Sequence, residues 1–309
     1  MIQRVLGRLV RLVGVCFGVL TLSFALRPVA GGDPVEALLF GQPSSPETVA
    51  NLRASFGLDQ PLHVQYLAYL NGVVRGDLGI SFNTRRPVAE EIGDRFWNTL
   101  LLASTSMCLG LLLGVGAGVA AALKRGSALD GIVLLLSTAG LAVPSFWLGI
   151  LLIEWFAVRL RWLPVAGAGS PAHLVLPVLT LAPVEAAALA RVARASLLDV
   201  LGQDYVRTAR AKGLAESTVV LRHALRSALI PTLTLASLQF GALLGGALVV
   251  ENIFAWPGLG QLAARAVSQR DYPVIQGIAV LLATTYVLAN AAVDVLCAVL
   301  DPRMREGVR

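Results

Sequence analysis

Long apolar runs separated by polar segments dominate the chain. A helix needs roughly 20 apolar residues to cross the hydrocarbon of a membrane. Runs of about this length lie at Leu12–Leu26, Thr99–Leu123, Gly131–Ile153, Leu174–Ala190, Ala228–Val250 and Val274–Leu300. The pattern therefore predicts an all-α, polytopic membrane protein with about six transmembrane helices, which form a single domain over residues 1–309.

The polar interval after the first run, residues 28–98, is too long to be only a connector. Within it, "SPETVANLRASFG" predicts a helix that Ser45 caps ahead of Pro46 and that Gly57 ends. A second helix is predicted for "PLHVQYLAYLNG", whose apolar residues lie on one side. We expect both helices to lie over the outer ends of the transmembrane helices, either as a packed cap or as a binding surface, and the two roles are compatible.

A second external region, "ENIFAWPGLGQLAARAVSQRDYPVIQG", separates the last two apolar runs. Trp256, Pro257 and Gly258 mark a turn in it, and "QLAARAVSQ" predicts a short helix after the turn. Trp256 and Tyr272 also suit the interface between membrane and water, where tryptophan and tyrosine side chains are enriched. That role remains an alternative to any contact with another protein.

One charged stretch, "DYVRTARAKGLAESTVVLRHALRSALIP", interrupts the apolar pattern between the fourth and fifth runs. The periodicity over Leu197–Lys212 predicts one amphipathic helix that projects beyond the membrane. Gly213 then ends this helix sharply, and "LAESTVV" begins a second, short helix. With Leu214 and Val219 exposed, the short helix is suited to docking on another protein; the alternative is a solvated loop with a helix lying on the surface.

Composition agrees with the membrane assignment. Hydrophobic residues make up 56% of the 309 residues and charged residues 14%, and the mean hydropathy is +0.73. An ordinary soluble domain carries about 25% charged residues. Most of the 25 lysines and arginines fall on one side if the N-terminus lies in the cytoplasm, which places both termini there. This topology accounts for the net charge of +6, so the charge does not call for a nucleic-acid partner.

The N-terminal run has two interpretations. Arg4, Arg8 and Arg11 ahead of a short apolar segment are also typical of a secretory signal peptide. The following "RPVAGGDP" lacks a good small-x-small cleavage pattern. We therefore expect an uncleaved membrane anchor, and sequencing of the mature N-terminus tests this expectation.

The sequence shows no machinery for catalysis. A phosphate-binding loop of the G-x-x-x-x-G-K-[ST] type needs a lysine directly after a glycine, but Lys124 follows Leu123 and Lys212 follows Ala211. No HExxH or GxSxG motif is present, and the histidines and cysteines are scattered. We therefore predict no enzyme activity, no cofactor and no metal site in this chain.

Glu185 is the one acidic residue deep within an apolar run. Charged groups inside spans are costly and are functional candidates by default. Glu185 either faces a cavity on a translocation path or pairs with an arginine such as Arg191 or Arg194.

The charged stretch also carries a resemblance. "DYVRTARAKGL" followed by "LRHALRSALIP" resembles the signature loop of permease subunits of bacterial ABC importers, in particular the dipeptide, oligopeptide and nickel branch. The similarity extends along the whole chain, through "GDPVEALL", "FGLDQPLHVQYLAYL", "GDLGISF", "VPSFWLGILL", "VVENIFAWPGLGQL", "RDYPVIQG" and "DPRMRE". Their order is similar to that in the first of the two paired peptide permeases.

The resemblance implies an inner-membrane complex that works by alternating access. The chain would pair with a homologous second permease on two cytoplasmic ATPase subunits, which bind ATP and Mg, and an external binding protein would deliver a peptide. Residues 194–228 would be the cytoplasmic coupling loop. Its implied ATPase contacts are Gly213, Leu214, Ala215, Glu216, Ser217, Thr218, Val219, Arg207, Arg210, Lys212 and Arg222. Trp256, Pro257 and Gly258 would contact the binding protein.

Other functions remain as alternatives. An importer of the same architecture for nickel, another metal chelate, glutathione, haem or another small conjugate is the closest of them. An ion-coupled secondary transporter belongs to a different class, and such proteins usually carry charged residues at several mid-span positions, whereas only Glu185 is deep in this chain. A receptor or scaffold without transport is the remaining possibility.

Overall fold

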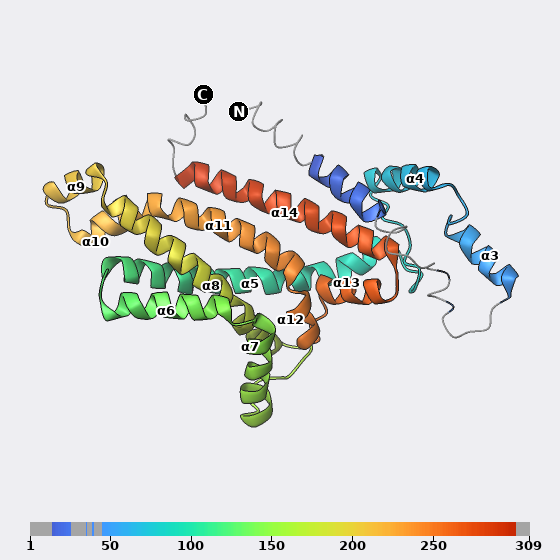
Figure 1. The fold of residues 1–309 in the computed structure, drawn as a ribbon, viewed down its shortest axis with the longest axis horizontal. Coiled ribbons are helices and arrows are strands. Elements are labelled where there is room, and N and C mark those ends of the chain that lie inside the picture. Colours follow the sequence, from blue (N-terminus) through green and yellow to red (C-terminus); the bar gives the residue numbers. More distant parts are fainter. Residues whose placement is uncertain (1–13, 26–34, 36–38, 40–44, 301–309) are drawn as a thin grey trace. The chain divides into compact units, whose positions relative to one another are not determined.

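The computed structural model describes residues 14–25, 35, 39 and 45–300 (Figure 1). The described part is all-α, as predicted, with a single isolated bridge between Ile80 and Pro87. Besides the helix Gly14–Ala25, its elements are α3 (Pro46–Ser55), α4 (Leu62–Val74), α5 (Val88–Leu123), α6 (Ala128–Ala142), α7 (Ser145–Leu152), π-helical η1 (Ile153–Arg159), α8 (Ala172–Leu201), α9 (Asp204–Ala211), α10 (Glu216–Thr218), π-helical η2 (Val219–Ala224), α11 (Leu225–Gly246), α12 (Leu248–Ile253), α13 (Leu259–Ser268) and α14 (Tyr272–Leu300).

Four helical segments are long and apolar enough to cross a membrane, and a bent pair of helices adds a fifth candidate. The four are Val88–Leu123, Ala172–Leu201, Glu216–Gly245 and Tyr272–Val293. The first predicted span appears as the shorter helix Gly14–Ala25, and the predicted residues Leu12, Val13 and Leu26 lie outside the described part. The multi-pass helical architecture is therefore confirmed.

The third predicted span is not one straight helix. Ala128–Ala142 and Ser145–Arg159 meet at an angle of 97°. The break lies at Val143, whose backbone is extended ahead of Pro144. A proline disfavours the helical conformation in the residue before it, so the apolar run Gly131–Ile153 continues through a point where the helix cannot.

Two further predicted boundaries were wrong. The single helix predicted over Leu197–Lys212 is divided, because α8 ends at Leu201 and α9 begins only at Asp204. Between them, Gln203 is extended, and glycine at position 202 is a weak helix former. The fifth span, predicted to continue to Val250, ends at Gly246, and α12 follows as a separate short helix.

The chain divides into two compact units. One contains Met1–Thr99 with Pro257–Val287, and the other contains Leu100–Trp256 with Leu288–Arg309. The helices α5 and α14 each contribute to both units.

The first unit carries the predicted external helices α3 and α4. Ser45 caps α3 by accepting a hydrogen bond from the backbone N–H of Thr48 at 3.2 Å, which confirms the predicted start. The α4 helix packs on Gly14–Ala25: the Tyr66 hydroxyl lies 2.7 Å from Thr21 Oγ1, and the Tyr66 ring is centred 5.1 Å from that of Phe24. Neither α3 nor α4 contains a fully buried residue.

A tight core holds the beginnings of α5 and α14 together with α13 in the same unit. Val88 and Ile92 of α5 pack with the apolar side of α13 and with Val274 and Ile278 of α14. Gly277 allows this approach, because a Cβ at that position would lie 2.7 Å from a methyl group of Val88. The loop before α5 is therefore attached to a rigid base.

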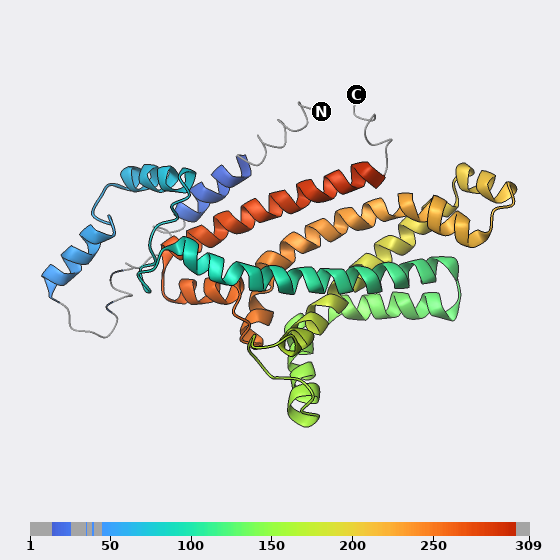
Figure 2. The same ribbon diagram turned by 180° about the vertical axis from the view of Figure 1, so that it is seen from behind.

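The second unit is built around α8, which packs against α6, α7 and α11. On α5, Gly110, Gly114 and Gly118 face α8, and a Cβ at any of them would come within 3 Å of an α8 atom. Small residues of this kind allow the close helix contacts typical of membrane bundles. In both views α6 runs beside the later part of α5 (Figures 1 and 2).

Candidate functional site

The charged stretch forms a compact loop between α8 and α11 of the second unit. After α9, the chain turns at Gly213, whose φ is +73°. This left-handed conformation strains other residues but not glycine. The short helix α10 follows and continues through η2 into α11. The predicted sharp turn at Gly213 and the short helix after it are both present in the structure.

An ion pair joins the two sides of this turn. The Arg210 guanidinium contacts Glu216 through Nε to Oε2 at 3.0 Å and through Nη2 to Oε1 at 2.6 Å. The hydrogen bond to Glu216 raises the pKa of Arg210. Both side chains are solvent-exposed, so the pair fixes the shape of the turn more than it stabilises the protein. Arg207 similarly contacts Asp204 within α9, at 3.3 Å.

Fewer residues of the loop are exposed than the sequence predicted. Leu214 is 40% exposed, and every residue from Lys212 to Ser217 is exposed, whereas Thr218 is half-buried. The prediction that Val219 is available for docking was wrong, because its side chain is fully buried. A pattern of apolar residues cannot distinguish a side chain that faces a partner from one that faces its own helices.

Below the exposed part, the loop packs on the ends of the long helices. Val206 and Ala209 of α9 and Val219 of η2 lie in one apolar cluster. The cluster also contains Ala122 of α5, Leu197 and Val200 of α8, and Ala224 and Ala228 at the η2–α11 junction. The exposed segment Lys212–Ser217 is therefore connected to α5, α8 and α11 through buried contacts.

A second ion pair, which the sequence did not reveal, lies between α6 and α8. Arg194 contacts Asp130 through Nε to Oδ1 at 2.5 Å and through Nη2 to Oδ2 at 2.8 Å. The Asp130 carboxylate also accepts a hydrogen bond from the Gly126 backbone at 3.0 Å. The two side chains are only 6% and 20% exposed, and because they lie 64 positions apart, no local signal in the sequence indicated the pair.

Replacing Arg194 with glutamine is expected to lower the melting temperature of the purified protein, because Asp130 would keep a mostly buried carboxylate without its bidentate partner. Exchanging the charges, with Asp130→Arg and Arg194→Asp together, is expected to recover part of the loss. Arg159→Gln is the matched control, because its partner Glu154 and Arg159 itself are exposed. Equal melting shifts for Arg194→Gln and Arg159→Gln would contradict a structural role for the α6–α8 pair.

Glu185 lies in the middle of α8, against α5. Its side chain is 9% exposed, and its Oε2 has no hydrogen-bond partner among the described residues. Gly110 provides the space, because a Cβ there would come within 2.8 Å of the Glu185 Cβ. The suggested pairing with Arg194 was wrong, because Arg194 is bound to Asp130.

The turn at residues 256–258, which the sequence predicts to be external, is less exposed than predicted. Trp256 is only 3% exposed, so an interfacial or protein-contacting position for its ring was wrong. Pro257 is half-buried, and its carbonyl accepts a hydrogen bond from Asn98 Nδ2 at 2.9 Å. Gly258 is buried. A tryptophan next to a Pro–Gly turn is also typical of a packed anchor, and the sequence alone did not separate the two.

Asp271 fixes the loop before α5 to the start of α14 in the first unit. Its carboxylate accepts hydrogen bonds from Ser81 Oγ at 2.6 Å and from the backbone N–H groups of Phe82 and Asn83 at 3.2 Å each. Asp271 is 3% exposed, and its acceptors are well satisfied. Because Asp271 lies about 190 positions away in the chain, no local pattern in the sequence indicated this link.

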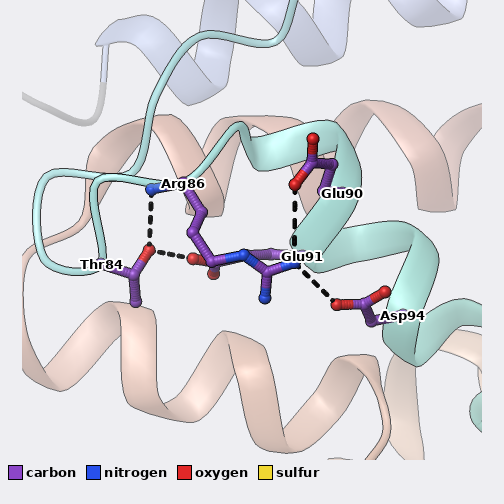
Figure 3. Close-up of polar contacts among 5 residues, drawn as sticks. All are labelled: Thr84, Arg86, Glu90, Glu91 and Asp94. Atoms are coloured by element: carbon purple, nitrogen blue, oxygen red, sulfur yellow. Dashed lines mark hydrogen bonds and ion pairs between the residues drawn. The ribbon is translucent and has the colours of Figure 1, made fainter.

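This loop forms one wall of a pocket of about 280 Å³, in the part of the chain that the sequence predicts to be external. We use the name external pocket for the site lined by Ser81, Thr84, Arg86, Glu91, Asp94, Arg95, Pro257, Leu262, Arg265, Ala266, Gln269, Asp271 and Val274. Figure 3 shows Arg86 beside Asp94, with an Nη2–Oδ2 distance of 3.1 Å, and Thr84 hydrogen-bonded to Glu91. The hydrogen bond to Asp94 raises the pKa of Arg86.

Comparison with known proteins agrees with this architecture. Residues 111–306 match the family described as binding-protein-dependent transport system inner membrane component, and residues 1–103 match the corresponding N-terminal family. The glutathione transport system permease protein GsiC of Escherichia coli (strain K12) is 46% identical over 305 residues, or 99% of each chain. GsiC of Salmonella typhimurium (strain LT2) has the same identity and coverage.

Among solved structures, the inward-facing MetNI methionine ABC transporter has a similar fold. Its SeMet soak crystal form gives a TM-score of 0.54 at 20% identity, with 68% of this chain and 96% of that chain covered. The native crystal form gives 0.52 with the same identity and coverage. At this identity the likeness concerns the fold alone. The family matches and the full-length relatives show that the chain belongs to the inner-membrane components of binding-protein-dependent transport systems, and that it is a multi-pass permease subunit of an ABC importer.

Proposed function

We propose that this chain forms one half of a peptide path across the inner membrane, with a homologous second permease as the other half. Two cytoplasmic ATPase subunits bind ATP and Mg and carry out hydrolysis, and an external binding protein delivers the peptide. The observation that carries the proposal is the exposed segment Lys212–Ser217, which is held on a buried base shared by α5, α8 and α11. Such a segment is suited to transmit motion from a docked subunit.

In this proposal the loop is the mechanical joint of the transporter. Leu214 inserts into a cleft of an ATPase subunit, while Lys212 and Arg222 orient the loop by charge. Arg210 acts indirectly, because its ion pair with Glu216 fixes the two sides of the turn. ATP binding closes the ATPase subunits and turns the path outward, and hydrolysis resets it. A difference in contact energy between the two states is what drives such a change.

The proposal fixes the orientation of the chain. Residues 194–228 and both termini lie in the cytoplasm, and residues 28–98 lie outside. The external helices α3 and α4 then face the binding protein, and so does the half-buried Pro257, whereas Gly258 is buried. Trp256 anchors the chain ahead of that turn, because its ring is buried.

A peptide substrate is supported by the full-length relatives, which are named as glutathione permeases. Glutathione is itself a tripeptide, and we include it among the proposed substrates. Nickel or another metal chelate remains the second candidate, since chelates and peptides both suit a polar path.

ATP-dependent uptake tests this function. The chain would be purified with its co-expressed partners, reconstituted in vesicles and supplied with labelled glutathione, a labelled dipeptide mixture or a nickel chelate. We expect uptake of a peptide that requires ATP and the binding protein. Uptake driven by an ion gradient without ATP would contradict the proposal, and ATP-driven uptake of nickel alone would replace the substrate but keep the architecture.

Glu185 is proposed to contribute to the translocation path. Glu185→Gln keeps the size of the side chain but removes its charge, and we expect slower uptake with normal assembly, because a carboxyl group within a span, whose Oε2 has no partner among the described residues, is a functional candidate. Uptake at constant amounts of complex measures the effect. Unchanged uptake in Glu185→Gln and in Glu185→Ala would remove this residue from the mechanism.

A further inference from the structure

The external pocket is enclosed by elements that are firmly held together. Arg95 Nη1 contacts Gln261 Oε1 at 3.2 Å, and Thr99 Oγ1 accepts a hydrogen bond from the Leu259 N–H at 2.7 Å. These contacts fix the first turns of α5 against α13. Since Asp271 holds the loop on the other side, the pocket is preformed rather than a transient gap between mobile segments.

Glu91 is the least expected group in this pocket. Glu91 is only 6% exposed. Among the described residues, its carboxylate accepts one hydrogen bond, which comes from the Thr84 hydroxyl. No cation of the described part lies within ion-pair distance of it. A buried carboxylate with so few donors is costly unless a positive group completes its environment.

The other carboxylates of the pocket are already satisfied. Asp94 pairs with Arg86, and Asp271 accepts several hydrogen bonds from the loop before α5. Figure 3 shows that Arg86 lies between Glu90 and Asp94, to both of which it makes ion pairs, at 3.5 and 3.1 Å. Glu91 is thus the acidic group of the pocket that still lacks a positive partner within the described part.

Arg265 is a positive group of the same pocket that also lacks a partner of opposite charge among the described residues. The Arg265 guanidinium, on α13, lines the pocket and has no ion pair or side-chain hydrogen bond with any residue that the structure describes. Arg265 and Glu91 line the same cavity but do not contact each other. The pocket therefore presents one unmatched negative group and one unmatched positive group at separate positions.

We propose that the external pocket binds a free zwitterionic peptide, with its ammonium group on Glu91 and a carboxylate on Arg265. This inference rests on the proposed peptide function and adds a recognition site on the permease itself. A peptide carries its two charges several bonds apart, which matches two separated groups that do not neutralise each other. A volume of about 280 Å³ is close to the lower end of the range for small-molecule pockets, roughly 300 Å³, so the pocket suits a ligand no larger than a dipeptide or tripeptide.

A direct binding measurement tests the proposal. The purified complex in lipid nanodiscs, without ATP and without binding protein, would be titrated with labelled glutathione and with labelled Ala–Ala dipeptide. We expect Glu91→Gln and Arg265→Gln each to weaken binding about tenfold or more, because a hydrogen bond to a charged group contributes roughly 1.5–3 kcal/mol. Glu90→Gln and Arg75→Gln are the matched controls, since neither residue lines the pocket, and both should bind normally.

Modified peptides identify which group binds where. N-acetylated peptide lacks the ammonium group, so it should bind weakly to the wild type and should be insensitive to Glu91→Gln. Peptide with an amidated carboxyl terminus should be insensitive to Arg265→Gln in the case of Ala–Ala. If the contact is direct, the loss from modifying the peptide and the loss from substituting its partner residue will not add up. If either residue has only a structural role, its substitution will weaken the binding of all peptides alike.

Three results would overturn the proposal. Wild-type complex that binds neither peptide, or variants that bind as the wild type does, would show that the pocket holds no peptide. If both variants lose docking of the binding protein and no peptide binds, the pocket is instead a docking site for the binding protein. ATP-driven uptake by the same wild-type preparation separates these outcomes from a failure of the proposed function: uptake without pocket binding leaves the peptide importer intact.

Discussion

Replacing Gly213 with proline is expected to abolish ATP-driven uptake while the protein still assembles in the membrane. Proline fixes φ near −65°, whereas Gly213 has a φ of +73°. Proline also lacks the N–H that Gly213 donates to the Arg210 carbonyl at 2.9 Å. The turn, and with it the position of Leu214, cannot form. We expect uptake to fall to background and the ATPase activity to lose its stimulation by loaded binding protein.

Alanine substitutions at two glycines distinguish the role of the Gly213 turn in coupling from the cost of placing a side chain at positive φ. Gly213→Ala and Gly126→Ala place alanine at φ values of +73° and +76°, and a Cβ at either position meets no atom within 4 Å. Each substitution should therefore cost a similar amount, about 1–2 kcal/mol. Only Gly213→Ala is expected to reduce the uptake per ATP hydrolysed. Equal coupling in the two variants, or normal uptake in Gly213→Pro, would refute the role of this turn.

Replacing Gly118 with alanine is expected to give the largest loss of stability among single methyl additions in the second unit. A Cβ at Gly118 would lie 2.5 Å from the Ala190 carbonyl oxygen and 2.9 Å from the Ala193 Cβ. The backbone oxygen cannot move aside without separating α5 from α8. Overpacking of this kind typically costs about 1–3 kcal/mol. Thermal unfolding of the purified protein in detergent measures the loss.

Gly116→Ala provides a control on the same helix. A Cβ at Gly116 meets no atom within 4 Å, so the substitution should be neutral or slightly stabilising. The two variants have the same change in composition and helix propensity, so any difference between them reports the contact with α8. If both variants unfold at the same temperature, the close packing of α5 on α8 is not present in the membrane protein.

Much of the fold was predictable because the membrane imposes simple rules. Residues in long apolar runs become helices, since the hydrocarbon offers no other partner for backbone groups. The cap at Ser45 and the turn at Gly213 were predictable for a similar reason, because each depends on the chemistry of one or two neighbouring residues. The bend at Pro144 was missed because the apolar run continues through it, and hydropathy outweighed the effect of the proline.

The parts that failed depend on contacts between distant residues. Val219 and Trp256 were predicted to be exposed, but their own chain covers them. The Asp130–Arg194 pair joins residues 64 positions apart, and Ser81 and Asp271 are 190 apart. One sequence carries no record of such pairs. The external pocket was missed for the same reason, because Glu91 and Arg265 come from α5 and α13 and line one cavity only in the folded unit.

Cysteine cross-linking at Leu214 tests the central claim most directly. In a background without native cysteines, Leu214→Cys would carry a photoactivatable cross-linker in the complex with its ATPase subunits. Leu67→Cys on α4 is the control, because Leu67 is also exposed but lies on the proposed external side. The account predicts a cross-link to an ATPase subunit from position 214 and none from position 67. No cross-link from position 214, in a complex that retains its ATPase subunits, would contradict it.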